Sequence, residues 1–178
     1  MAAPVRPVRA GPMGVFARCA GKTGQRMCDM TPERLRIVRE TWKRFEPRAA
    51  EHARYFYDKL FELDPETVGM FDRAKMDLQR HRLMESLGML IAELDDPEQL
   101  VTDLVTLGRR HVAYGVRDSD YSAAGIALLW TLEKALGPEF TPEARAAWTE
   151  AYQAIASVMR RVSTVVTGAH QGPHAPYL

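Results

Sequence analysis

Hydrophobic residues recur at helical spacing along nearly the whole chain from residue 31 onward. In the first such segment Leu35, Val38, Trp42 and Phe45 follow one another at intervals of three and four residues. This spacing puts their side chains on one face of an α-helix. No segment alternates apolar and polar residues over the length of a strand. The pattern therefore predicts an all-α fold.

Helix start signals divide this pattern into about seven helices. Thr31-Pro32-Glu33 supplies a capping side chain, a proline in the first turn and an acidic residue near the helix N-terminus. The same signal recurs at Asp64-Pro65, Asp96-Pro97 and Thr141-Pro142, and Ser119 is a further candidate cap. The predicted helices span 31–45, 49–61, 64–71, 97–111, 119–136 and 141–162, and a further helix after Phe71 carries an apolar face at 83–94. Lengths this unequal favour helix pairs that cross at about 50° over an up-and-down four-helix bundle.

Composition and charge narrow the class of protein. The 178 residues are 46% apolar and 26% charged, which favours one globular domain with tails. The longest apolar stretch without charge, Tyr121 to Leu132, is shorter than the roughly 20 residues of a membrane-spanning helix. Residues 1–29 carry a net charge of +4 and the remainder −3, so the helical part has no positive excess for nucleic acid. The two cysteines, Cys19 and Cys28, form no disulfide framework, and we expect a cytoplasmic protein.

The candidate chemistry centres on one histidine. The chain contains no glycine-rich phosphate loop and no Cys-x-x-Cys pair, and the histidines spaced four apart, His170 and His174, lie in the polar tail. Among the five histidines, His111 follows Leu107 by four residues and Leu104 by seven, so its imidazole lies on an apolar stripe that faces the interior. A core histidine bonded to a backbone carbonyl and a metal-ligating histidine both fit this position.

Short motifs around His111 and in the first half of the chain occur in a characteristic order. They are Thr41-Trp42, Phe56-Tyr57-Asp58-Lys59-Leu60-Phe61, Met70-Phe71-Asp72, Gly108-Arg109-Arg110-His111, Tyr114-Gly115-Val116, Leu132-Glu133-Lys134-Ala135-Leu136-Gly137 and Phe140-Thr141-Pro142-Glu143. This set, within residues 31–162, resembles the globin family, in particular bacterial single-domain globins, neuroglobin and the globin domain of flavohaemoglobins. The resemblance implies a globin fold around a non-covalently bound haem b. We expect a globin domain at 30–164, a disordered basic extension at 1–29 and a flexible tail at 165–178.

The resemblance also assigns roles to individual residues. It implies that His111 is the iron ligand, that Phe71 packs against the porphyrin, and that Tyr57 lies over the open coordination position. Leu107 and Val116 are then expected to contact the haem. Tyr121 stands ten residues after His111, as in flavohaemoglobins, and is either a neighbour of the ligand or a core residue.

The position of the next distal residue depends on the register of the helix that follows Phe71. If His81 faced the haem, Glu85 would face it too, and an unpaired buried carboxylate is costly. Gln79 instead places Leu83 below it on the apolar stripe. We therefore expect Gln79 and Leu83 at the haem and a solvated His81.

The proximal side departs from the flavohaemoglobin pattern. The glutamate of that family aligns near Ser163, and no acidic residue occurs after Glu150. The expected partner for the second nitrogen of His111 is therefore a backbone carbonyl.

These expectations lead to two candidate functions. The first is a haem globin that binds O2 at a pentacoordinate ferrous iron for storage or transport. The alternative is a nitric oxide dioxygenase that converts NO and O2 to nitrate with an external reductase, with Tyr57 and Gln79 as its catalytic residues. A phenol and an amide donor in a dry pocket stabilise the partial negative charge on O2 in both cases. CO is a further candidate ligand, with less to gain from these donors.

Overall fold

The structure, a computed structural model, describes residues 30–169 and confirms the all-α prediction. Over these residues it contains six α-helices and no strand. The helices are α2 (Pro32–Phe45), α3 (Ala49–Leu63), α4 (Met76–Ala92), α5 (Pro97–Ala113), α6 (Asp118–Leu136) and α7 (Pro142–Ala169). The predicted basic extension at 1–29 lies outside the described residues. No helix within 30–169 is long and apolar enough to span a membrane.

The helix start signals operate as predicted at three positions. The Thr31 hydroxyl accepts a hydrogen bond from the backbone N–H of Arg34, and Asp96 and Thr141 cap α5 and α7 in the same way. The segment predicted at 64–71 is a 3₁₀ helix, η3 (Pro65–Met70), with Asp64 as its cap. Such tight helices occur mainly in short pieces.

Two predicted boundaries were wrong, and one that the sequence left open is now defined. Helix α4 begins at Met76, so it contains Gln79 as well as the apolar stripe that starts at Leu83. Ser119 does not cap α6: the helix begins at Asp118, and the Asp120 carboxylate accepts the backbone N–H of Arg117 instead. At the other end, α7 continues to Ala169, so residues 165–169 of the predicted tail 165–178 are helical, and the remainder of that tail lies outside the described residues.

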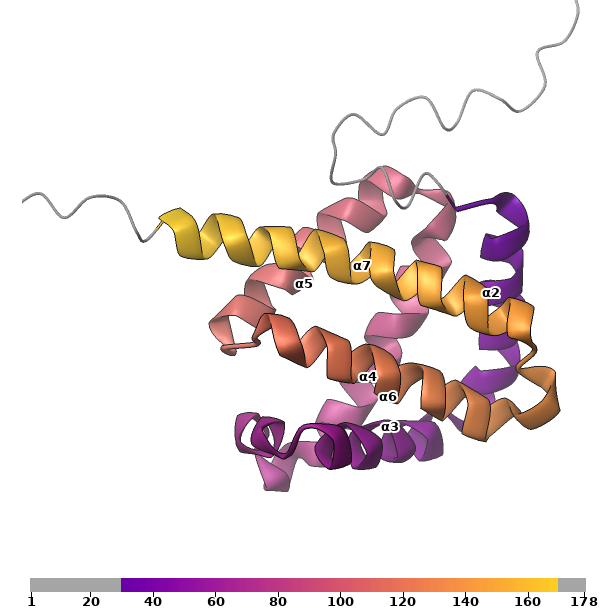
Figure 1. The fold of residues 1–178 in the computed structure, drawn as a ribbon, viewed down its shortest axis with the longest axis horizontal. Coiled ribbons are helices and arrows are strands. Elements are labelled where there is room, and N and C mark those ends of the chain that lie inside the picture. Colours follow the sequence, from indigo (N-terminus) through magenta and orange to yellow (C-terminus); the bar gives the residue numbers. More distant parts are fainter. Residues whose placement is uncertain (1–29, 170–178) are drawn as a thin grey trace, which may run out of the picture.

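Helix α7 is the central packing element. It runs beside α6, with α2 against its N-terminal half and α5 against its C-terminal half (Figure 1). The Trp148 indole N–H of α7 donates to the Thr41 hydroxyl of α2 at 2.7 Å. Gly108 of α5 allows close approach, because a Cβ there would lie 3.1 Å from the Cβ of Val162. These contacts hold α5, the helix that carries His111, against the core.

Candidate functional site

The candidate site lies between α4 and α5, two helices that pack mainly against other helices and not against each other. Helix α4 packs against α3 and α2, and α5 against α7, but α4 and α5 are not a closely packed pair. Apolar side chains on both remain half-exposed, including Leu83 and Leu87 of α4 and Leu107 of α5. Val116, in the turn after α5, is also half-exposed. A flat apolar group could cover these side chains, and its burial would be favourable.

A hydrogen bond within α5 fixes the ring of His111. Its Nδ1 donates a hydrogen bond to the backbone carbonyl of Leu107, 2.9 Å away, which is the kind of partner the sequence predicted. Burial lowers the pKa of the imidazole, and this carbonyl opposes the shift without reversing it. The ring is therefore neutral at pH 7. Nε2 then carries a lone pair, and no hydrogen-bond partner for it occurs among residues 30–169.

His111 does not belong to a cluster of metal-ligating side chains within residues 30–169. Over these residues, no group of three or more His, Cys, Asp or Glu side chains could hold a metal ion. A single imidazole in apolar surroundings suits a metal whose other ligands come from a prosthetic group. The surroundings of His111 therefore fit a haem and do not fit a bare ion.

Tyr57, Gln79 and Phe71 lie together on the other side of the site. Tyr57 is buried, with 3% of its surface exposed, and its ring meets that of Phe71 edge-on at a centroid distance of 5.3 Å. Burial raises the pKa of the Tyr57 phenol, and a hydrogen bond with the Gln79 side chain offsets part of this rise. The phenol is therefore protonated at neutral pH and can donate a hydrogen bond.

His81 lies apart from these residues. Its side chain is 68% exposed, and its Nε2 lies 3.1 Å from a carboxylate oxygen of Glu85. Gln79, by contrast, is half-buried beside Tyr57. This is the register that the sequence favoured for α4.

Tyr121 is both a core residue and a neighbour of His111. The two rings stack with centroids 6.0 Å apart and an interplanar angle of 19°. The Tyr121 carbonyl accepts a hydrogen bond from the Tyr152 hydroxyl, whose ring fits only because residue 125 is glycine. Burial raises the pKa of the Tyr121 phenol. The two roles left open by the sequence are therefore compatible.

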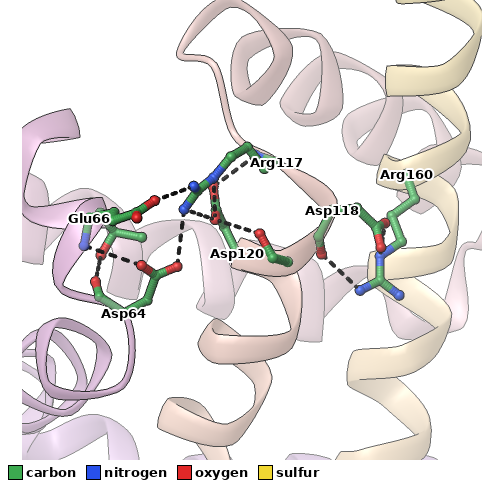
Figure 2. Close-up of polar contacts among 8 residues, drawn as sticks. Asp64, Glu66, Arg117, Asp118, Asp120 and Arg160 are labelled. Atoms are coloured by element: carbon green, nitrogen blue, oxygen red, sulfur yellow. Dashed lines mark hydrogen bonds and ion pairs between the residues drawn. The ribbon is translucent and has the colours of Figure 1, made fainter.

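Arg160 is a proximal residue that the sequence analysis did not find. Its guanidinium lies 5.5 Å from the centroid of the Tyr121 ring and pairs with Asp118 at 2.7 Å (Figure 2). It also donates to the hydroxyl of Ser122. An arginine on the solvated side of a long helix gives no signal in a periodicity analysis, because its partners belong to another helix.

The comparisons with known proteins concern the family of the chain and its fold. The globin family model matches residues 54–159. Neuroglobins from Danio rerio and Tetraodon nigroviridis are each 28% identical to the chain over 138 residues, which covers 70% of this chain and 87% of each relative.

Two solved structures share the fold. A bacterial globin from Campylobacter jejuni superposes with a TM-score of 0.70 at 22% identity, over 78% of this chain and 99% of its own. A hexacoordinated heme protein from an anhydrobiotic tardigrade does so with a TM-score of 0.70 at 16% identity, over 76% of this chain and 96% of its own. At these identities the likeness concerns the fold alone.

Proposed function

The chain belongs to the globin family, whose members bind haem, and on that basis we propose that it holds haem b non-covalently through His111 and binds O2 reversibly. The observation that carries this proposal is the state of His111. The Leu107 carbonyl fixes the ring through Nδ1, and burial keeps it neutral, so Nε2 is available as a ligand.

The chain's own residues supply the rest of the site. Leu83, Leu107 and Val116 offer apolar surface to the cofactor, and Phe71 contributes an aromatic ring. Bound haem supplies the iron at which a small gas ligand attaches. Tyr57 donates a hydrogen bond to such a ligand, because its buried phenol remains protonated, and Gln79 orients the phenol and offers an amide donor of its own.

The proposal includes a vacant sixth position in the ferrous protein. Two observations support it: His81 is exposed and paired with Glu85, and Gln79 is the side chain in contact with Tyr57. An amide is a poor iron ligand compared with an imidazole. The tardigrade relative, which is described as hexacoordinated, differs in this respect from what we propose here.

Haem reconstitution tests the proposal. The ferrous protein is expected to give the absorption spectrum of five-coordinate haem with a histidine ligand. His111→Gly is expected to lose this spectrum, and free imidazole to restore it, because imidazole can occupy the space of the deleted side chain. His81→Gln is the matched control and is expected to leave the spectrum unchanged. Absence of haem uptake by the wild type, or a wild-type spectrum in His111→Gly without imidazole, contradicts the proposal. A spectral change in His81→Gln contradicts the vacant sixth position.

A second candidate function is nitric oxide dioxygenation. The contact between Tyr57 and Gln79 favours it, because two donors at one position can both polarise O2 and hold the developing anionic product. Each turnover also requires a reductant. Stopped-flow mixing of the oxygenated protein with NO, with nitrate assayed in the presence and absence of a reductase, distinguishes this enzyme from a carrier: catalytic nitrate formation requires the reductase.

A further inference from the structure

A cluster of four charged residues joins two segments that are far apart in the sequence. Arg117, in the turn between α5 and α6, lies between Asp64, Glu66 and Asp120 (Figure 2). Its guanidinium nitrogens lie 2.5 Å from Glu66, 3.3 Å from Asp64 and 2.8 Å from Asp120. We call these four residues the Arg117 cluster.

The acidic members of the Arg117 cluster differ in burial, and burial determines how strongly each contact with Arg117 stabilises the cluster. The Asp120 and Asp64 side chains are 7% and 17% exposed, whereas Glu66 is 77% exposed. An exposed pair such as that with Glu66 contributes little. Asp120 is different, since burial opposes its charge, yet hydrogen bonds from the side chain and backbone of Arg117 keep the pKa of its carboxyl below the ordinary value. Loss of Arg117 would leave this carboxylate without its cation, and it would also remove the contact with the Asp64 carboxylate, which belongs to the other segment.

Each side of the cluster continues directly into the site. On one side, Asp64 caps η3, which ends at Met70, and the next residue is Phe71. On the other side, Arg117 follows Val116, whose backbone N–H donates to the carbonyl of His111 at 3.0 Å. The cluster therefore connects the corner that carries Phe71 with the turn that carries the end of the His111 helix.

We infer that Arg117 is a positioning residue that holds the Phe71 corner and the His111 turn at a fixed separation, and so slows the loss of haem. The inference rests on the proposed function for its haem component. Arginine suits this role because its planar guanidinium can contact three carboxylates at once, whereas a lysine ammonium is a single point of charge.

Haem transfer to an excess of a haem-free acceptor globin measures this effect. Arg117→Gln is expected to release ferric haem about tenfold faster than the wild type, since charged hydrogen bonds to buried partners are lost. The matched control is Arg36→Gln, which removes an arginine that also bridges two carboxylates, Glu33 and Glu40, but within α2 alone. Release from Arg36→Gln is expected to stay within about twofold of the wild type. Equal release rates in Arg117→Gln and Arg36→Gln overturn the inference.

A second variant and a second readout cover the case in which Arg117→Gln folds poorly. Asp64→Asn with Glu66→Gln retains Arg117 and its contact with Asp120, and the amide oxygen introduced at position 64 can still cap η3. In the haem-free protein this double variant is expected to accelerate amide hydrogen exchange both at 65–71 and at 114–118. Acceleration confined to 65–71 indicates a local effect on η3 and overturns the coupling. Because this readout needs no haem, it tests the cluster even if the wild type takes up none, a result that would refute the proposed function alone.

Discussion

Replacement of Tyr57 by phenylalanine isolates the donor on which the proposed ligand binding depends. The substitution removes one hydroxyl and retains the ring that packs against Phe71 and Phe61. Tyr57 is only 3% exposed, so water cannot replace the lost donor efficiently. A hydrogen bond to a charged acceptor contributes about 1.5–3 kcal/mol. Gln79 remains as a second donor, which favours the lower half of that range, and we expect O2 dissociation to accelerate about tenfold to fortyfold.

The assay is stopped-flow displacement of O2 by CO from the ferrous protein. Tyr121→Phe is the matched control, because Tyr121 is similarly buried at 6% exposure but stacks against His111. Any effect through the imidazole should change O2 and CO dissociation together, whereas loss of the Tyr57 donor should change O2 dissociation far more. An O2 dissociation rate in Tyr57→Phe within about twofold of the wild type, or an equal acceleration for CO, refutes the assigned role.

Two further predictions concern stability. Thr41→Val is expected to lower the free energy of unfolding by about 1–3 kcal/mol, because it leaves the buried indole N–H of Trp148 without its acceptor. The control is Thr131→Val, which is expected to cost less because the Thr131 hydroxyl donates only to a carbonyl of its own helix. Urea denaturation compares the two variants. Burial lowers the pKa of His52 below its ordinary value of 6.5, so the unfolded chain binds the proton more tightly and the folded state loses stability as the pH falls below 6.5. The pKa of His111 is lowered in the same way in the haem-free protein, so His52→Gln is expected to reduce this pH dependence of stability without removing it. The reduction is at most about 1.4 kcal/mol per pH unit, the value for one proton. An unchanged pH dependence in His52→Gln contradicts the assignment.

The helices could be predicted from the sequence because their signals are local. A threonine or aspartate followed by proline is close enough to the first turn to cap it, and the structure shows these caps at Thr31, Asp96 and Thr141. The start of α6 was missed because its local signal is ambiguous. Three polar residues in succession, Asp118, Ser119 and Asp120, could each cap a helix, but all three lie in the first turn of α6, and Asp120 accepts the backbone N–H of the preceding residue, Arg117.

The site was predictable to the extent that helical faces determine it. Periodicity placed His111 and Leu83 on apolar stripes, and the cost of burying Glu85 separated Gln79 from His81. Arg117 and Arg160 left no such trace, because the partners that join them to other elements lie at least 38 residues away. A periodic pattern shows which face of a helix is buried, but it does not show which charged side chain reaches it from elsewhere.

The proximal surroundings bear on the choice between the two candidate functions. Strong electron donation from an axial imidazole requires a carboxylate or comparable acceptor that makes the ring more basic. Here Nδ1 donates to a neutral backbone carbonyl, and the Tyr121 ring that stacks on the imidazole lies beside the cationic Arg160. Burial keeps the ring neutral, and among residues 30–169 Nδ1 has a carbonyl and not a carboxylate as its partner. In the function proposed above, a ligand of this kind favours reversible binding of O2 over its chemical conversion. We therefore take the proximal side as support for the carrier, since the distal donors would serve either function.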